Sequence, residues 1–318
     1  MNKCPLFGKC GGCKFDFTAD DYRASKLALL RNLPSAGAPV WIEPGQRRRA
    51  DFSFLNGRFG FFAPRAKDIV PVGHCPALTA PLNEILPLVA KMPWTGSGGV
   101  LITECENGIA VDVGSITSYF SAEFKKAADI SPIIRITWNN KIVRQSAEPR
   151  VKFGDIAVDY PPNAFLQPGK TGENALRALV AKSARDANKA ADLFCGLGNF
   201  TFALGAAHVD GFDIAGGIRR DLFKKPLTAR ELRKYDCVVM DPPRAGAMAQ
   251  SKELAKSDVR RVVYVSCSPE TFMRDSGILT RGGYELSALT PVDQFVGSMH
   301  WELVGVFDKL KIINSQFA

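Results

Sequence analysis

One cysteine of the chain stands where a nucleophile could work. Cys267 lies in VSCSPET (265–271), at the end of an apolar segment that predicts a buried strand and just before a predicted helix start. Since the amino end of a helix favours negative charge, we expect this thiol to be partly ionised and able to attack an electrophile. A single cysteine is otherwise most simply a small apolar core residue. The helix start and a second sheet-end loop with Asp241 favour the nucleophile.

That second loop, DPPRAG (241–246), directly follows DCVVM (236–240). It therefore lies at the carboxyl end of a predicted strand, where open α/β sheets bind their ligands. The Asp-Pro-Pro sequence is shared with enzymes that methylate exocyclic amines of flipped bases. Those enzymes have an aromatic residue where this chain has Arg244, so amine methylation is the second choice of reaction.

A glycine-rich turn indicates a nucleoside site. ADLFCGLGNF (191–200) predicts a strand, a turn with Gly196 and Gly198, and a helix start, and the glycines leave room for a nucleoside. Asp213 ends a second predicted strand, where its carboxylate can accept hydrogen bonds from both ribose hydroxyls. Phe200 stands where a dinucleotide site has its third glycine, so the pattern favours S-adenosylmethionine. A tight turn in any doubly wound sheet is the alternative.

Four of the eight cysteines lie in the first quarter of the chain. Cys4, Cys10 and Cys13 have the spacing Cys-x5-Cys-Gly-Gly-Cys, and Cys75 offers a distant fourth thiolate. Four such ligands suit a [4Fe–4S] cluster or a tetrahedral zinc ion. Zinc ribbons usually have two Cys-x2-Cys pairs and this chain has one, while the Cys-Pro pairs and nearby glycines favour the cluster. Four unrelated buried cysteines are the remaining alternative.

The C-terminal half has the elements that could bring the nucleophile, the carboxylates and the glycine turn together. A helix is predicted over 171–186, and apolar strands are predicted before the glycine turn and over 236–240 and 261–266. Apolar strands that alternate with helices indicate a buried, mostly parallel sheet. We therefore expect an α/β fold with a doubly wound, Rossmann-like catalytic domain over 161–318.

The N-terminal half has a different pattern. A short amphipathic helix is predicted over 21–33, and alternating residues around Asn56-Gly57 predict a hairpin. A helix-like stretch over 81–92 precedes strand-like segments around 100–113 and 133–144. We expect an iron–sulfur module over 1–80 and an α+β middle region that contacts RNA over 81–160, with the catalytic domain beginning near 150–165.

The composition limits the classes of protein that fit. The chain has 318 residues, of which 46% are hydrophobic, so it can form real cores and is not intrinsically disordered. No apolar segment reaches the roughly 18 residues of a membrane-spanning helix, and no signal peptide follows the first residues, so we expect a cytoplasmic protein with reduced cysteines. The net charge of +9 points toward a polyanion, of which nucleic acid is the commonest.

Six motifs in one order carry a specific resemblance. They are the cysteine pattern, FLQ (165–167), DLFCGLGNF (192–200), DPPRAG (241–246), VSCSPET (265–271) and HWE (300–302). Over nearly its whole length the chain resembles the RNA 5-methyluridine (uracil-C5) methyltransferase family, in the iron–sulfur branch without an N-terminal β-barrel. The resemblance implies S-adenosylmethionine as methyl donor and C5 of one uridine as acceptor. It implies 23S ribosomal RNA as the usual substrate, with transfer RNA as the nearest variant, and we expect a monomer.

The resemblance also implies roles for single residues. Uracil C5 is a poor nucleophile until a thiolate adds to C6, and Cys267 fits that step. Glu302 matches the family glutamate that removes the C5 proton, although a solvated strand carboxylate is its simpler interpretation. Asp241 matches a residue between cofactor and uracil, where it can accept the N3–H. Contacts to the cofactor are implied for Gln167, Phe194, Asn199, Asp213 and Asp241.

A target uridine must leave its stack to reach Cys267, and basic residues can compensate that cost through phosphate contacts. Arg47, Arg48 and Arg49 are the best candidates in the sequence. An ordinary solvated basic turn is the alternative for this triplet.

The chain departs from the family pattern between Asp213 and Asp241. A doubly wound sheet would place a helix, a strand and another helix there, and one strand–helix–strand unit alone takes about 30 residues or more. Either one crossover is missing or a segment of the native protein is, and the contacts to adenine stay open. A cluster-bearing RNA-binding protein without catalysis is therefore a third interpretation.

Overall fold

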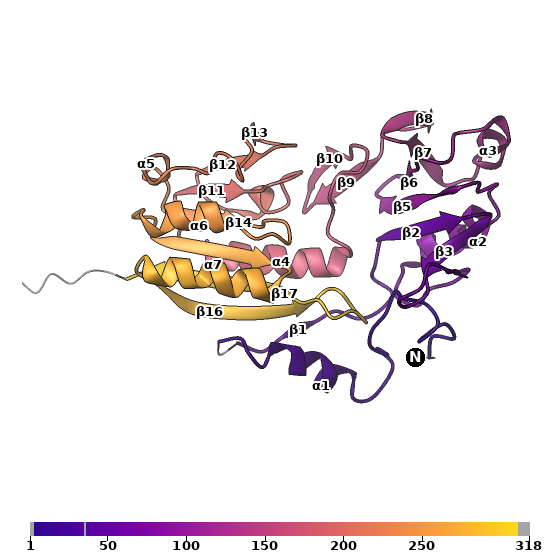
Figure 1. Cartoon of the computed structure of the whole chain (residues 1–318). Coiled ribbons are helices and arrows are strands. Elements are labelled where there is room, and N and C mark those ends of the chain that lie inside the picture. Colours follow the sequence, from indigo (N-terminus) through magenta and orange to yellow (C-terminus); the bar gives the residue numbers. More distant parts are fainter. Residues whose placement is uncertain (1–2, 35, 311–318) are drawn as a thin grey trace, which may run out of the picture. The chain divides into compact units, whose positions relative to one another are not determined.

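The structure is a computed structural model that describes residues 3–34 and 36–310 (Figure 1). The chain folds into two compact units, each made of several stretches of sequence. The first unit contains the N-terminal chain as far as Arg31, Ile42–Glu173 and Gln294–Met299. The second unit contains Asn32–Trp41, Asn174–Asp293 and the chain from His300 onward. None of the helices in the described residues is long and apolar enough to cross a membrane.

The first unit is built around a seven-stranded sheet in the order β4-β3-β2-β5-β6-β7-β8. Its strands are β2 (Arg49–Leu55), β3 (Arg58–Phe62), β4 (Ile69–Pro71), β5 (Ser97–Cys105), β6 (Gly108–Gly114), β7 (Ile133–Trp138) and β8 (Lys141–Gln145). All neighbours are antiparallel except β6 and β7. A separate hairpin pairs β9 (Arg150–Phe153) with β10 (Ile156–Asp159).

The predicted hairpin at Asn56-Gly57 is confirmed. Leu55 pairs with Arg58, so the loop has only two residues, and both have positive φ, 48° for Asn56 and 84° for Gly57. Positive φ at both central residues is the requirement of a type I′ turn, which Asn-Gly meets at low cost. The alternation on either side of the turn then places one face of β2 in the core.

Short helices complete the first unit. They are α1 (Tyr22–Leu27) with the 3₁₀ turn η1 (Ala28–Leu30), α2 (Ala80–Ala90) and α3 (Ala122–Ala127). The helix α2 packs against the sheet and buries Leu82, Ile85, Leu86 and Val89. Aromatic rings fill the core beside it: Phe54 stacks on Trp94 at 4.7 Å between centroids, and Trp94 meets Phe124 edge-on at 5.0 Å. The helices predicted over 21–33 and 81–92 are thus confirmed.

The structure divides the chain differently from the predicted regions 1–80, 81–160 and 161–318. The first two regions share one sheet, because β2 pairs with β5 from Arg49 opposite Thr103 to Leu55 opposite Ser97. The segment Asn32–Trp41 belongs to the second unit instead, where β1 (Val40–Trp41) pairs with β16 (Tyr284–Asp293). The division follows from pairing between strands that are distant in the sequence, and the local composition does not indicate it.

The second unit contains an eight-stranded sheet in the order β1-β16-β17-β15-β14-β11-β12-β13. Its remaining strands are β11 (Lys189–Leu193), β12 (His208–Asp213), β13 (Ile218–Arg219), β14 (Cys237–Met240), β15 (Arg261–Ser266) and β17 (Glu302–Lys309). The strands from β13 to β15 are parallel, and β17 is antiparallel to both its neighbours. Every residue of β14 is buried, as expected for a sheet covered on both faces.

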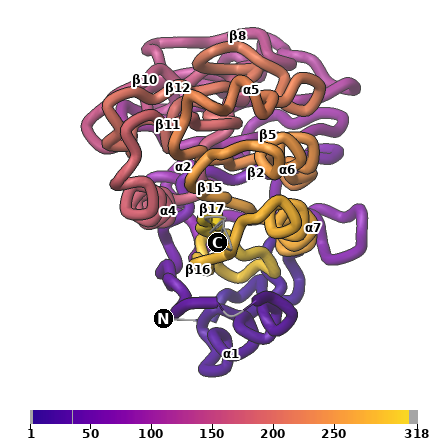
Figure 2. Tube along the Cα trace, turned by 90° about the vertical axis from the view of Figure 1, so that its left-hand side faces the viewer, coloured from indigo at the N-terminus to yellow at the C-terminus, as the bar shows by residue number. Residues whose placement is uncertain are grey.

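Helices lie on both faces of this sheet. They are α4 (Lys170–Ser183), η2 (Thr201–Ala203), α5 (Ala229–Leu232), α6 (Met248–Ala255) and α7 (Pro269–Arg281). Figure 2 shows α4 on one side of β15 and β17, and α6 and α7 on the other. The predicted α/β architecture is therefore present in the second unit.

The connection after β12 is as short as the sequence suggested. Only residues 214–217 separate β12 from β13, which pairs with it in parallel, and α5 is a single turn. Two glycines permit this tight path. A Cβ on Gly216 would lie 2.1 Å from the carbonyl oxygen of Gly196, and Gly217 has φ +59°. The expected crossover helix between these strands is absent from the described residues.

A buried ion pair ties β2 to the start of α4 within the first unit. Arg48 Nη2 lies 2.5 Å from Glu173 Oε2, and the Glu173 side chain has no exposed surface. Lys170 Nζ also contacts Glu173, at 3.1 Å. Removing one partner of a buried pair leaves the other charge without compensation.

We expect Glu173→Gln to lower the free energy of unfolding by about 3–5 kcal/mol, because Arg48 would stay buried without its carboxylate. Urea unfolding followed by circular dichroism measures this loss. Asp159→Asn is the matched control, since its ion pair with Arg150 is 66% exposed on the carboxylate side and should change stability by less than about 1 kcal/mol. Equal effects of the two variants would contradict the assignment.

Candidate active site and thiol pocket

The predicted site residues of the second unit lie along one edge of its sheet. In the order β15-β14-β11-β12, the strands end at Ser266, Met240, Leu193 and Asp213. Cys267, Asp241 and Phe194 each directly follow a strand end, and Asp213 is itself one. Because the carboxyl ends of parallel strands meet at the same edge, the fold brings these four together.

The turn after β11 has an unusual backbone. Phe194 has φ +63°, in the left-handed region that non-glycine residues seldom occupy, and Gly198 has φ +95°. A Cβ on Gly198 would lie 2.5 Å from the ring of Phe202, whereas a Cβ on Gly196 would meet nothing within 4 Å. Glycine is thus required at 198 by packing, and the space above Gly196 is open. Such strain tends to occur where a ligand is held.

Asn199 supplies the test of whether a cofactor fits here. Both polar atoms of its side-chain amide are buried, and neither has a hydrogen-bond partner among the described residues. Buried amides nearly always have partners, so this pair of atoms calls for a polar ligand. The main-chain carbonyl of Asn199 accepts a bond from the Arg177 guanidinium, which fixes the turn. These features fit a nucleoside or amino-acid group of S-adenosylmethionine.

The carboxylate of Asp213 is engaged with the backbone. It accepts hydrogen bonds from Gly196 N at 3.1 Å and from Ala215 N at 2.7 Å. These bonds hold the glycine turn against the end of β12. A carboxylate has about four lone-pair sites, so ribose hydroxyls can still bind it. The predicted ribose contact stays a prediction.

Asp192, within β11, is a residue whose importance the sequence reasoning missed. Its side chain is fully buried, Thr201 donates to it at 2.6 Å, and its Oδ1 has no partner among the described residues. Burial raises the pKa of Asp192 to about 7. An acidic residue inside an otherwise apolar strand was the signal that could have identified it.

Cys267 lies beside two carboxyl groups. Pairing of β15 with β17 sets Ser266 opposite Leu303, so Glu302 comes next to Cys267. Burial, then Glu302 and Asp241, raise the pKa of Cys267 to about 11, while Arg244 acts in the opposite sense. The expected partial ionisation at the start of α7 is therefore wrong for the protein without ligands. The effects of burial and of the nearby acids on the pKa of Cys267 are larger than the effect of the helix amino terminus.

The two carboxyl groups also affect each other. Burial, then Glu302 and Asp192, hold the pKa of Asp241 well above its ordinary value. The Glu302 side chain is buried, which excludes the simple interpretation as a solvated strand carboxylate. Perturbed acids next to a thiol at a ligand-binding sheet edge are typical of an active site.

Asp275 of α7 fixes the DPPRAG loop, and the sequence reasoning did not identify it. This fully buried carboxylate accepts hydrogen bonds from Ala247 N at 2.7 Å, Tyr264 Oη at 2.8 Å and Arg274 Nε at 2.8 Å. Arg274 also donates to Ala245 O at 3.0 Å. The loop that carries Asp241 is thereby fastened to the helix that follows Cys267.

Gln167 belongs to the first unit, unlike the other predicted cofactor contacts. It is buried, and its side-chain oxygen accepts a hydrogen bond from Gln294 Nε2 at 2.9 Å. Its predicted role in cofactor binding stays a prediction.

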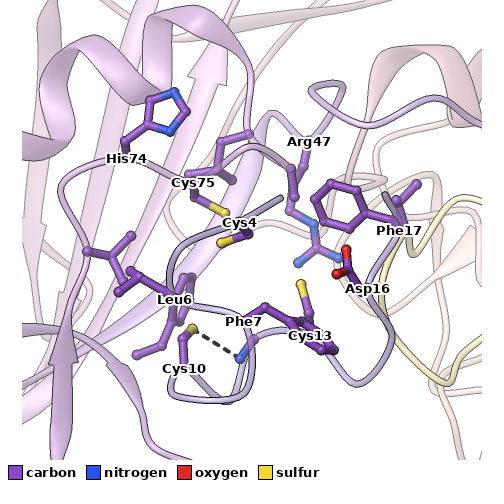
Figure 3. A pocket seen from close by; sticks show the side chains of 16 residues that line it. Cys4, Leu6, Phe7, Cys10, Cys13, Asp16, Phe17, Arg47, His74 and Cys75 are labelled. Carbon is purple, nitrogen blue, oxygen red and sulfur yellow. Dashed lines mark hydrogen bonds between the residues drawn. The ribbon is translucent and has the colours of Figure 1, made fainter. Parts of the chain in front are cut away.

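The four N-terminal cysteines come together around one pocket of the first unit. Cys4, Cys10, Cys13 and Cys75 all line it, with Arg47 beside them (Figure 3). Burial, then Cys75 and Cys10, raise the pKa of Cys13 to about 12. In the described part of the chain, however, no group of three or more His, Cys, Asp or Glu side chains is arranged to hold a metal ion.

The Asn83 side chain holds the main chain at Cys75 beside the pocket. Asn83 accepts from Cys75 N at 2.8 Å and donates to Cys75 O at 3.1 Å. Gly297 must stay small, because a Cβ there would lie 2.9 Å from Cys13 Sγ. The empty space between the lining residues is about 710 Å³, part of it open to solvent.

The arginine triplet is not the solvated basic turn of the simpler interpretation. Arg48 is buried against Glu173, so its proposed contact with RNA phosphates is wrong. Arg47 faces the thiol pocket, where burial lowers its pKa. Arg49 lies over the ring of Phe165 at 5.7 Å and is the member of the triplet that stays a candidate for RNA.

Comparisons with known proteins show which family the chain resembles. The family model described as tRNA (Uracil-5-)-methyltransferase matches residues 217–311. An uncharacterized RNA methyltransferase of Caulobacter vibrioides is 34% identical over 358 aligned positions, which cover 96% of this chain and 85% of the relative. The 23S rRNA (uracil(1939)-C(5))-methyltransferase RlmD of Salmonella paratyphi A is 30% identical, over 97% of this chain and 82% of the relative.

A solved structure shares the fold. The crystal structure of Pyrococcus abyssi tRNA (uracil-54, C5)-methyltransferase in complex with S-adenosyl-L-homocysteine matches with a TM-score of 0.72 and 22% identity, over 90% of this chain and 82% of that one. The 358 positions aligned with the Caulobacter relative exceed the 318 residues of this chain, so that relative has residues without a counterpart here. Sequence and fold lead to one conclusion: the chain belongs to the RNA uracil-C5 methyltransferase family and is an S-adenosylmethionine-dependent enzyme.

Proposed function

We propose that the protein methylates C5 of a specific uridine in 23S ribosomal RNA through a covalent cysteine adduct and so forms 5-methyluridine. The observation that carries this proposal is the placement of Cys267 beside Glu302 and Asp241 at the ligand-binding edge of the sheet. The ribosomal substrate rests on the relative of that activity, which is 30% identical. The same reaction on transfer RNA is the second candidate, supported by the description of the matching family model.

The residues divide the reaction into separate tasks. Cys267 Sγ, as thiolate, adds to C6 of uracil and makes C5 nucleophilic. S-adenosylmethionine supplies an electrophilic methyl group, which C5 takes as the sulfonium–methyl bond breaks. Glu302 then accepts the C5 proton, and the electron pair of that bond expels the thiolate from C6. Asp241 accepts the N3–H of the base and holds it in place.

Ionisation of Cys267 requires help in this site. A pKa of about 11 leaves the thiol protonated near neutral pH. A nearby positive charge favours the thiolate, and the donor is a sulfonium cation. Arg244, whose charge lowers the pKa of Cys267, adds to this effect. We therefore expect binding of the donor to favour the thiolate form of the nucleophile.

The cofactor contacts are proposed for the residues named from the sequence. Phe194, Asn199, Asp213 and Asp241 would hold the donor along the sheet edge. For Gln167, a contact with the donor is proposed from its sequence motif alone. The orphaned amide of Asn199 is the strongest support among these, since a ligand would satisfy it.

We also propose that Cys4, Cys10, Cys13 and Cys75 hold a [4Fe–4S] cluster. All four thiols line one pocket (Figure 3). Four thiolates can bind a [4Fe–4S] cluster or a zinc ion. The single Cys-x2-Cys pair and the Cys-Pro pairs of the sequence favour the cluster. The bound cluster would link the segment that carries Cys4, Cys10 and Cys13 to Cys75.

Two other functions predict different results. An exocyclic-amine methyltransferase would not need Cys267, and Arg244 stands where such enzymes have an aromatic residue. A cluster-bearing RNA-binding protein without catalysis would not bind the methyl donor. The assays below separate these possibilities.

We expect Cys267→Ala to reduce methylation to background, because the proposed reaction begins with addition of the Cys267 thiolate to C6. The purified protein is incubated with labelled S-adenosylmethionine and ribosomal or transfer RNA, and the RNA is digested to nucleosides. Label should appear in 5-methyluridine with the unchanged protein. Cys105→Ala is the control, since Cys105 lies in β5 of the other unit. Label in a methylated amine, or activity that survives Cys267→Ala, would exclude the proposal.

We expect Glu302→Gln to slow turnover by about 10²–10⁴-fold, the usual contribution of a general base. Methyl transfer should still occur, so a covalent complex of protein and methylated RNA should accumulate. Denaturing gel electrophoresis with labelled donor detects it, and Glu302→Gln combined with Cys267→Ala should not form it. Unchanged turnover would remove Glu302 from this role.

We expect anaerobically purified protein to contain about four iron atoms per chain and to absorb visible light as iron–sulfur proteins do. Cys13→Ser should lose most of the iron, because one of four thiolates is removed, whereas Cys105→Ala should keep it. Metal analysis of both variants measures this. Stoichiometric zinc without sulfide would contradict the cluster.

A further inference from the structure

The short connection after β12 brings an aromatic ring to the cofactor edge. Phe223 lies after β13, and its ring centroid is 5.4 Å from that of Phe194, with the two planes inclined at 54°. Phe194 directly follows β11, at the predicted nucleoside turn. Phe223 is 49% exposed, so about half of its surface is free to contact a ligand.

The turn that carries Phe223 is well fixed. Asp221 Oδ1 accepts hydrogen bonds from Phe223 N at 3.1 Å and from Lys224 N at 3.2 Å. Arg220 donates to Lys225 O at 2.7 Å and pairs with Glu231 at 2.6 Å. The ring is therefore presented by an ordered turn, and little conformational entropy would be lost when a ligand binds it.

Polar groups that could bind a nucleoside lie in the second unit, at the glycine turn that follows Phe194 and at the end of the neighbouring strand. Asn199 has a buried amide without a partner among the described residues, and Asp213 ends the adjacent strand. The space above Gly196 is open. A nucleoside would match both the aromatic rings and the polar groups, since the faces of its base are apolar and its ribose carries hydroxyl groups.

We propose that Phe223, together with Phe194, forms the adenine-binding surface for S-adenosylmethionine in this chain. The inference rests on the proposed cofactor site. It assigns the residue that contacts the base, a contact that the sequence left open because of the short connection after β12. Two rings inclined to each other can contact a base on a face and along an edge, a geometry that aromatic pairs favour. The exposed part of Phe223 would be covered by adenine.

Binding of S-adenosylhomocysteine to the full chain tests this proposal by isothermal titration calorimetry, without any catalytic step. We expect Phe223→Ala to raise the Kd about tenfold, in the range that loss of one base–aromatic stack produces. Phe223→Trp should keep the Kd within about twofold of the unchanged protein. Ile218→Ala is the matched control, since Ile218 is equally exposed in the same connection and should leave the Kd unchanged.

A ligand without the base separates stacking from a general structural effect. S-ribosylhomocysteine lacks adenine, so its Kd should be the same for the unchanged protein and for Phe223→Ala. In Phe223→Trp, S-adenosylhomocysteine should quench the added indole fluorescence, and S-ribosylhomocysteine should not.

Several results would overturn the inference. An unchanged Kd for S-adenosylhomocysteine in Phe223→Ala, or equal weakening of both ligands, excludes an adenine contact. Concentration-dependent dimerisation that Phe223→Ala abolishes at unchanged Kd would assign the exposed ring to a second copy of the chain. Failure of the unchanged protein to bind S-adenosylhomocysteine would overturn the cofactor site itself, and the inference with it.

Discussion

The active site depends on acidic groups that the fold concentrates at one edge of a buried sheet. Besides burial, Glu302 and Asp192 raise the pKa of Asp241, and Glu302 and Asp241 raise the pKa of Cys267. Burial of several acids is unfavourable unless positive charge accompanies them. S-adenosylmethionine carries a sulfonium and an ammonium group, so its charge complements the site. On the proposed mechanism, binding of the donor and ionisation of the nucleophile are therefore coupled.

Local patterns predicted the strands, the Asn56-Gly57 hairpin and the glycine turn correctly, because each depends on residues close in sequence. The errors concern distant partners. The pKa of Cys267 is raised first by burial and then by Glu302, which comes next to it through the antiparallel pairing of β15 with β17. Arg48 is buried by Glu173, which no spacing rule connects to it. The charge and burial of these side chains depend on the tertiary structure, which cannot be read directly from a single sequence.

The sheet edge is formed although the connection after β12 is short. Gly216 and Gly217 let the chain turn directly onto β13, so the end of β12 and its Asp213 stay in register with β11. The apolar side chains Ile214 and Ile218 are left exposed, as expected where a covering helix is absent. Loss of that helix alters what surrounds the nucleoside turn, and the strand ends themselves remain in place.

Positioning of the two reactive loops depends on a group that takes no part in the chemistry. The DPPRAG loop and α7 follow the neighbouring strands β14 and β15, so the sheet brings their starts together, and further contacts fix the loop against the helix. Asp275 joins them, because one buried carboxylate binds Ala247 of the loop, Tyr264 of β15 and Arg274 of α7. A shift of about 1 Å between reacting groups can cost about a hundredfold in rate. A rigid junction between the Asp241 loop and the Cys267 helix is therefore as necessary as the reactive side chains.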